Sequence, residues 1–422
     1  MKILFIANHF PPINNSASIR ILNYVNHLQM LGNEVIVLTP DYPKDFINYD
    51  KELLHNIDSS IKVIRVDIGS IYKKIYPRRG MQNNNVSPKK PNIKSTFKTY
   101  IKRNLAIPDS YFEWKNNAAK IGDDLIKKYK VDIIISTHET PSCHLVGLKL
   151  KKSNPKVRWI TYWSDPWTFE YYRSRESLLK RNIEKWLERK VVKNSDKLLF
   201  TTEETKELYI SNYSVPKNKT DIVYRGFEEY SKNKTDQFIG IFKKNKINLV
   251  HTGEIYTELR DTRPLIEALN TLEKEEKSIF DQINIVLVGG IDNLEIKEEL
   301  KNIDCISLLP RVPYEEAQNY MHNSDGLLLW GNKYGSQIPG KVYEYFGVEF
   351  PILTILANNQ DPVGPLMKEV DKGPIIYNNA QEIKQMIKEF VQNQDKNKHW
   401  YEVIPKYRWE NVAKDLFSKI LN

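Results

Sequence analysis

The sequence has few residues of the kinds that build disulfide frameworks or membrane spans. Its 422 residues include two cysteines, Cys143 and Cys305, which lie far apart in sequence and fit a reducing compartment. No run of eighteen apolar residues occurs, so we expect no membrane-spanning helix. The apolar run after Met1 is too short for a secretory signal and lacks a small-residue cleavage site. These absences predict a cytoplasmic protein.

Motifs for metals and dinucleotides are also missing. The sequence contains no Asp-x-Asp motif and no histidines or cysteines clustered at ligand spacing, so we expect a metal-independent site without a cofactor. The turn after the first expected strand, residues 2–7, has no G-x-G-x-x-G. A dinucleotide is therefore not expected there.

The composition that is present indicates a folded protein with anionic partners. Hydrophobic residues make up 41% and aromatic residues 11% of the chain, which is enough to build sizeable cores. The length suggests two domains. The formal net charge of +10 suits nucleotides, phospholipid headgroups, polyprenyl phosphates or nucleic acid.

Apolar runs and helical segments alternate twice along the chain. The pattern predicts an α/β fold with two Rossmann-like, doubly wound domains facing a cleft. We expect an N-terminal domain over residues 1–230 and a C-terminal domain over 231–404, which begins with a polar, lysine-rich linker. A helix over 405–422 is expected to pack back on the first domain. The predicted strands lie at 2–7, 34–39, 61–66, 133–136, 159–163, 198–201, 222–223, 248–251, 283–288, 305–309, 327–330 and 352–356.

Residues 325–354 have the pattern of apolar, glycine and helical segments that is typical of a ligand-binding unit. A buried strand is followed by a glycine-rich loop and a short helix from about Gly340, so the loop lies at the carboxyl edge of the sheet. The first helical amides and Lys341 favour an anion there. Glu344, about one turn in, could accept hydrogen bonds from a ribose diol. The alternative is an ordinary loop with a solvated glutamate.

Residues 70–105 carry ten lysines and arginines and no acidic residue, interleaved with aromatic and apolar side chains. This composition is typical of a segment that contacts an anionic membrane surface. A solvated excursion is the alternative. A long basic helix over 170–194 supports a second alternative, nucleic-acid binding, on charge alone. That alternative rests on Arg173, Arg175, Lys180, Arg181, Lys185 and Arg189.

Several segments together resemble one family. The chain resembles retaining GT-B glycosyltransferases of family four, the group 1 type, in five segments: HFPPINNSASIRILNYVNHLQMLGNEVIVLT, IPDSYFEWKNNA, STHETPSCH, WSDPW and HTGEIYTELRDTRPLIEAL. The Glu-x7-Glu motif of that family is matched in part, with Glu344 in the second position and Ser336 in the first. The resemblance covers essentially the whole chain.

The resemblance implies where a nucleotide sugar would bind. Gly253 would approach the donor and Glu344 would hold the ribose. In the family an arginine directly follows that glycine, whereas here Glu254 does, so Arg260 and Arg263 would supply the charge for the diphosphate. The rest of the donor side would be Ser336, Gln337, Ile338, Pro339, Gly340, Lys341 and Val342.

The acceptor side would lie in the first domain, with Ser16, Ser18, Arg20, His138 and Asp165. Asp165 or His138 would accept a proton or orient an acceptor hydroxyl. With Arg260 and Lys341, which would stabilise the leaving diphosphate, these two residues form the expected catalytic set.

The resemblance also implies an activity. We expect a hexosyltransferase-type enzyme that moves a sugar from a UDP-linked donor to a polysaccharide or polyprenyl-linked glycan in capsule or cell-wall synthesis. It would act at the inner face of the plasma membrane and retain the configuration of the sugar. The acceptor would attack from the side of the leaving group, and no protein nucleophile would be needed. A nucleotide-sugar epimerase of the same fold is the alternative.

Overall fold

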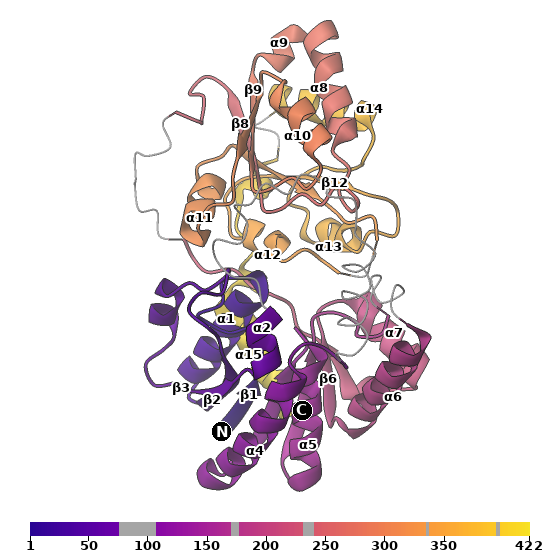
Figure 1. Ribbon diagram of the computed structural model, residues 1–422. Helices are drawn as coiled ribbons and strands as arrows, with labels where there is room; N and C mark the ends of the chain where they lie inside the picture. The colour runs from indigo at the N-terminus through magenta and orange to yellow at the C-terminus, as the bar shows by residue number, and fades with distance from the viewer. Residues whose placement is uncertain (76–106, 170–176, 231–239, 335–336, 394–396) are drawn as a thin grey trace. The chain divides into compact units, whose positions relative to one another are not determined.

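The computed structural model describes residues 1–75, 107–169, 177–230, 240–334, 337–393 and 397–422 (Figure 1). The chain forms two compact units. Unit 1 consists of Met1–Tyr224 and Val412–Asn422, and unit 2 of Arg225–Asn411. Each unit has its own parallel sheet and its own core.

Unit 1 is built on a seven-stranded parallel sheet of order β3-β2-β1-β4-β5-β6-β7. Its strands are nearly continuous apolar runs because helices cover both faces of the sheet. The strand order reverses between β1 and β4, and ligands bind at such a point in doubly wound folds. The strands are β1 (Lys2–Ile6), β2 (Glu34–Asp41), β3 (Lys62–Asp67), β4 (Ile133–Thr137), β5 (Arg158–Trp163), β6 (Lys197–Phe200) and β7 (Thr220–Ile222).

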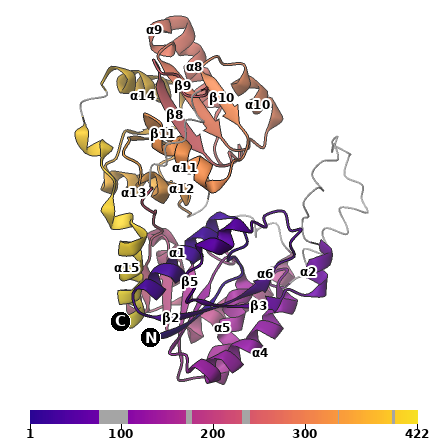
Figure 2. The ribbon, with the colours of Figure 1, turned by 90° about the vertical axis from the view of Figure 1, so that its left-hand side faces the viewer.

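Helices lie on both faces of this sheet, with α1 on one face and α4 and α5 on the other (Figure 2). The side chain of Asn15 starts α1 by accepting a hydrogen bond from the Ser18 amide at 2.8 Å. The last helix contributes to unit 1 from Val412, and Arg158 donates to its carbonyl oxygens of Ile420 and Leu421. The helices are α1 (Ser16–Met30), α2 (Ser70–Ile75), α4 (Phe112–Tyr129), α5 (Pro141–Ser153), α6 (Leu178–Asn194), α7 (Glu203–Tyr213) and α15 (Trp409–Leu421).

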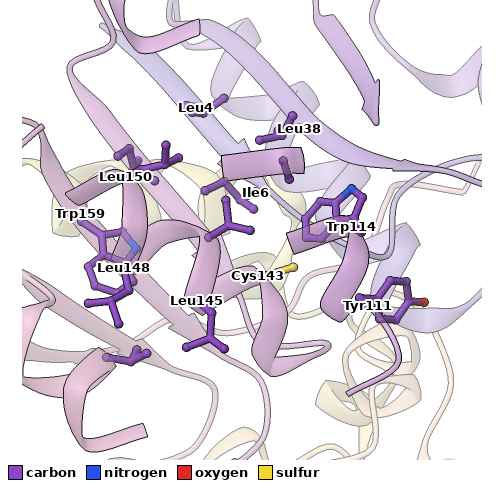
Figure 3. Close-up of a cluster of buried hydrophobic side chains, with 14 of the residues drawn as sticks. Leu4, Ile6, Leu38, Tyr111, Trp114, Cys143, Leu145, Leu148, Leu150 and Trp159 are labelled. Carbon is purple, nitrogen blue, oxygen red and sulfur yellow. The ribbon is translucent and has the colours of Figure 1, made fainter. Parts of the chain in front are cut away.

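The core of unit 1 lies between the sheet and the α4–α5 layer (Figure 3). Leu4 and Ile6 of β1 and Trp114 of α4 contribute buried side chains. Gly147 lets α5 approach the sheet closely, since a Cβ there would lie 2.4 Å from the Trp159 indole nitrogen.

Unit 2 repeats the plan with a six-stranded parallel sheet of order β10-β9-β8-β11-β12-β13. Its switch point lies between β8 and β11. The strands are β8 (Ile247–Thr252), β9 (Ile283–Val288), β10 (Ile306–Leu309), β11 (Gly326–Trp330), β12 (Ile352–Leu356) and β13 (Ile375–Tyr377). The helices are α8 (Arg263–Glu275), α9 (Lys277–Phe280), α10 (Leu294–Lys301), α11 (Tyr314–His322), α12 (Lys341–Tyr345), α13 (Val363–Val370) and α14 (Ala380–Gln392).

The two doubly wound sheets predicted from the sequence are confirmed. Four elements of unit 2, α9, α13, β13 and α14, were not predicted. The helix expected over 405–422 starts only at Trp409, because residues 405–407 form a 3-10 turn. Of the basic helix expected over 170–194, the described part is α6, and residues 170–176 lie outside the described residues. Among the described helices, none is long and apolar enough to span a bilayer.

Candidate functional site

The carboxyl edge of the unit 2 sheet brings the β8 and β11 loops together at the switch point. Gly253, directly after β8, has φ +100°, and its backbone is exposed. A Cβ at this position would lie 3.1 Å from the Lys341 Nζ. Only glycine adopts this conformation readily, so the loop can leave room for the Lys341 ammonium beside its backbone.

Lys341, the first residue of α12, is held by a histidine from the end of β8. Its Nζ lies 2.9 Å from the Nε2 of His251, whose Nδ1 lies 2.9 Å from the Leu328 carbonyl oxygen. Because a carbonyl oxygen can only accept, Nδ1 carries the proton, and Nε2 accepts from Lys341. Burial and the charge of Lys341 lower the pKa of His251 well below its usual value, which keeps the ring neutral.

A second cation, Arg260, lies in the loop after β8. Its Nε donates to Asn332 Oδ1 at 3.0 Å and its Nη1 donates to the Glu254 carbonyl oxygen at 2.8 Å. Burial lowers the pKa of Arg260, and burial together with the charge of Arg260 lowers the pKa of Lys341 well below its usual value.

These two cations are held by neutral groups. Within the described part of the chain, neither Arg260 nor Lys341 has a carboxylate oxygen within 4.0 Å. An anion placed against both would offset their desolvation and their mutual repulsion. The edge of the sheet is therefore built for a negatively charged group.

Glu344 lies in the same short helix and forms an ion pair with Arg225. The Arg225 Nη2 is 3.1 Å from Glu344 Oε1, and both side chains are largely buried. Burial raises the pKa of Glu344, whereas Arg225 and Lys341 lower it. Arg225 fixes one carboxylate oxygen and leaves the other able to accept from a ligand.

The other predicted donor residues are placed less centrally. Arg263 is 69% exposed and pairs with Asp261 at 2.7 Å. Gly340 is the N-cap residue of α12 and Val342 is fully buried, while Gln337, Ile338 and Pro339 are partly buried. Because α12 has only five residues, the side chains rather than the helix terminus define the anion site. Ser336 lies outside the described residues.

In unit 1 the switch point brings together Arg20 of α1 and Glu139, which follows β4. Their side chains form a buried ion pair, with the Glu139 side chain 2% exposed. The Arg20 guanidinium also lies 5.3 Å from the centre of the Tyr162 ring. Although burial opposes its charge, Tyr162, Glu139 and Asp165 raise the pKa of Arg20.

This ion pair has unused hydrogen-bonding capacity. Arg20 Nε, Glu139 Oε2 and the hydroxyl of Ser18 are buried and have no hydrogen-bond partner among the described residues. Buried polar atoms are nearly always paired, so this edge is suited to a polar ligand. Ser16 lies exposed in the first turn of α1.

Asp165, after β5, belongs to the same charged cluster. Burial raises its pKa, whereas the hydrogen bond from Ser164 and the charge of Arg20 lower it. The Ser164 hydroxyl lies 2.7 Å from Asp165 Oδ2 and 2.6 Å from the His138 carbonyl oxygen. A hydroxyl has one proton, so both contacts are full hydrogen bonds only when Asp165 is protonated.

His138 is separated from this cluster by the direction of its side chain. Its ring stacks on Trp163 at 5.1 Å and on His144 at 5.3 Å, within the aromatic core of unit 1. Its backbone, in contrast, is linked to Asp165 through Ser164. The structure therefore groups Arg20 with Asp165 and places the His138 imidazole among core aromatic rings.

Three residues of these sites were not predicted: His251, Arg225 and Glu139. His251 had a usable signal, because it is the penultimate residue of a buried strand, two residues before Gly253. Arg225 and Glu139 are 119 residues from their partners Glu344 and Arg20, and nothing in the local sequence indicates either contact.

The described residues include no group of three or more histidine, cysteine or acidic side chains placed to hold a metal ion. Independence from metal remains a prediction.

Comparisons with known proteins were made by sequence and by structure. The family model Glycosyltransferase Family 4 matches residues 98–229. No curated protein matches the sequence. A glycosyltransferase from Rickettsia africae has a TM-score of 0.65 and 14% identity, covering 99% of this chain and 97% of that one.

Two structures with nucleotide sugars are also similar. HepE from Anabaena in complex with UDP-glucose has a TM-score of 0.62 and 11% identity, covering 100% and 99% of the two chains. UDP-GlcNAc 2-epimerase from Neisseria meningitidis bound to UDP-GlcNAc has a TM-score of 0.58 and 13% identity, covering both chains fully. The GT-B fold is thus confirmed, and the family four resemblance is supported.

Proposed function

We propose that this protein with the GT-B fold is a glycosyltransferase that takes its sugar from a UDP-linked donor. The observation that carries the proposal is the pair of cations Arg260 and Lys341, held by neutral partners at the switch point of unit 2. A diphosphate is an anion of the right kind for two such cations. Glu344 stands in the same helix as Lys341 and can accept from the ribose.

Transfer is favoured over other reactions by the sequence of unit 1. The family model that matches residues 98–229 is one of glycosyltransferases. The named ligands of two similar structures are UDP-glucose and UDP-GlcNAc, which supports a UDP-linked hexose as donor. We infer that the acceptor is a polysaccharide or polyprenyl-linked glycan of the capsule or cell wall, at the cytoplasmic face of the plasma membrane.

The chemistry follows from the charges. Negative charge develops on the leaving diphosphate as the bond to the sugar breaks, and Lys341 and Arg260 stabilise it without any reorganisation. His251 keeps the Lys341 ammonium directed at the loop of Gly253, and Arg225 keeps Glu344 in place. Asp165 orients an acceptor hydroxyl or takes its proton, beside Arg20. Retention remains part of the proposal.

A second candidate function is epimerisation of the donor sugar. The Neisseria meningitidis epimerase aligns over the whole of both chains, and a putative UDP-N-acetylglucosamine 2-epimerase from Listeria monocytogenes covers 99% of this chain. An epimerase needs no acceptor. The two candidates therefore differ in what happens to a UDP-sugar when the protein is incubated with it alone.

The test is to incubate the full chain with UDP-glucose or UDP-GlcNAc, with and without a lipid-linked glycan extract, and to follow UDP and the sugar by proton NMR. We expect UDP release that depends on the extract and an α-linked product from an α-linked donor. Inversion at sugar C2 without any acceptor would establish the epimerase. Failure of every donor to react or bind would contradict both candidates.

A further inference from the structure

The exposed side of α6 has an unusual combination of side chains. Leu178 and Leu179 are 74% and 73% exposed, and Trp186 is 55% exposed. Ten large hydrophobic side chains are exposed in the described part of the chain, and three of them lie on this one helix. Scattered exposed hydrophobic residues are ordinary, whereas a cluster on one helix indicates an interaction surface.

Basic residues share this side of the helix. Arg181, Lys185, Arg189 and Lys193 are exposed and follow Leu178 at intervals of three or four residues, which places them on one face. Lys190 lies over the Trp186 ring, with its Nζ 3.3 Å from the ring centre. The helix therefore presents cations and an aromatic ring together.

The acidic residues of α6 are on its opposite side. Glu184 and Glu188 are buried. Glu184 pairs with Lys180, and Glu188 accepts from the hydroxyls of Tyr209 and Tyr213. The exposed face of α6 consequently carries no acidic residue, although the helix itself contains two. Figure 1 shows α6 beside α7 on the outside of unit 1.

A pocket adjoins the last two turns of this face. It has a volume of about 490 Å³ and lies between the ends of α6 and α7. Arg189, Lys193 and Lys219 line it, with no carboxylate among the lining residues. The acidic residues of α7, Glu203, Glu204 and Glu207, are in its first two turns, away from the end that lines the pocket.

We propose that the exposed face of α6 docks on an anionic phospholipid bilayer, with a headgroup phosphate in the pocket of Arg189, Lys193 and Lys219. Charge complementarity selects an anionic surface, and the leucine pair with Trp186 selects one that has an apolar phase below its charges. A nucleic acid would use the cations and leave both leucines in water. This inference extends the membrane location in the proposed function, and it can be tested separately because vesicle binding needs no sugar donor or acceptor.

The test is co-sedimentation of the full chain with vesicles that contain phosphatidylglycerol or only phosphatidylcholine. A charge variant replaces the four face cations by glutamine, R181Q, K185Q, R189Q and K193Q. An apolar variant carries L178S, L179S and W186S. The matched control removes four exposed lysines from the helices of unit 2, K274Q, K277Q, K297Q and K301Q.

We expect binding to phosphatidylglycerol vesicles only, weakened roughly fivefold for each face cation removed. The apolar variant should bind at least about tenfold more weakly. The unit 2 control should bind like the native chain. Since all the replaced side chains are exposed, circular dichroism melts of the variants should match that of the native chain.

Three outcomes would overturn the inference. One is equal binding by the native chain and both α6 variants, which would place membrane contact elsewhere. Another is equal affinity for soluble glycerol phosphate, which would make the pocket a site for a free phosphate. The third is loss of oligonucleotide binding in the charge variant without loss of vesicle binding.

Discussion

At the scale of single residues, the proposed site in unit 2 depends on two cations, Arg260 and Lys341, that form no ion pair within the described part of the chain. Burial disfavours the charge of both Arg260 and Lys341, and the charge of Arg260 further lowers the pKa of Lys341. Such an arrangement costs free energy in the empty protein and recovers it when an anion binds. A purely structural ion pair would consist of one cation and one carboxylate, whereas this site has two cations, which suits an anionic ligand.

Arg260 and Arg263 form a natural pair for testing this account. Replacement of Arg260 by glutamine should raise the KM for the UDP-sugar about ten- to a hundredfold, because a charged hydrogen bond to phosphate is worth roughly 1.5–3 kcal/mol. R263Q should change KM less than about twofold, since Arg263 is exposed and pairs with Asp261. Steady-state kinetics of both variants decides the point, and equal effects would contradict it.

Asp165 should control the pH dependence of transfer. Burial raises the pKa of its carboxyl, so the ionised form that accepts a proton is lost at a higher pH than for an ordinary aspartate. We expect activity to fall as the pH is lowered through this raised value. D165N should reduce turnover about a hundredfold and remove the acidic limb of the pH–rate profile. A variant with native turnover and an unchanged profile would exclude Asp165 from the reaction.

The same carboxyl affects stability with a defined sign. Its pKa is higher in the folded than in the unfolded chain, so the folded state binds more protons between the two values. Its contribution is present below the unfolded pKa and is lost as the pH rises through the folded pKa. The melting temperature of D165N should therefore gain on that of the native chain as the pH is raised, and a constant difference would contradict this linkage.

At the scale of elements, the turn after β8 and the helix α12 form the proposed donor side of unit 2. The turn brings its backbone against Lys341, and α12 presents Lys341 and Glu344 one turn apart. Side chains from other elements, His251 and Arg225, then fix the two charged groups of the helix.

The turn can be tested with two alanine substitutions. G253A should destabilise the protein by about 1 kcal/mol or more, since its φ of +100° is unfavourable for alanine, and should weaken UDP binding by moving Lys341. G240A is the control, because a Cβ at Gly240 would have no atom within 4 Å. Thermal melts with and without UDP measure both effects. Equal melting curves for the two variants would show that the turn is not strained.

Variants of the Arg225–Glu344 ion pair should affect the stability of unit 2 and the binding of the UDP-sugar to different extents. R225M leaves a buried carboxylate unpaired and should destabilise unit 2 by roughly 3 kcal/mol. E344Q retains the shape and removes the charge, so it should alter stability less and weaken UDP-sugar binding about tenfold. Denaturant unfolding and donor KM separate the two. If E344Q bound the UDP-sugar with native affinity, Glu344 would not be a ligand of the ribose.

At the scale of the whole molecule, the sequence predicted the features that depend on neighbouring residues in the chain. Alternating apolar runs and glycine turns predicted both sheets, and the strand-loop-helix unit around Gly340 predicted the positions of Lys341 and Glu344. Contacts between distant segments were not accessible, since Lys341 and His251 are 90 residues apart.

Local charge was a less reliable guide than local apolar pattern. Arg263 was predicted at the diphosphate from its charge, yet Asp261 two residues earlier pairs with it at the surface. Lys180 was counted with the basic residues of its helix, but it is buried beside Glu184. The element β13 has only three residues, too few to show a strand pattern.

The central claim is that the cations at the switch point of unit 2 bind the diphosphate of a UDP-sugar. Calorimetric titration of UDP into the full chain, its K341M variant and its K333Q control tests it most directly, because Lys333 is exposed in the loop after β11. We predict one UDP per chain, with affinity at least about tenfold weaker in K341M and unchanged in K333Q. Absence of UDP binding, or equal affinity in the native chain and K341M, would contradict the account.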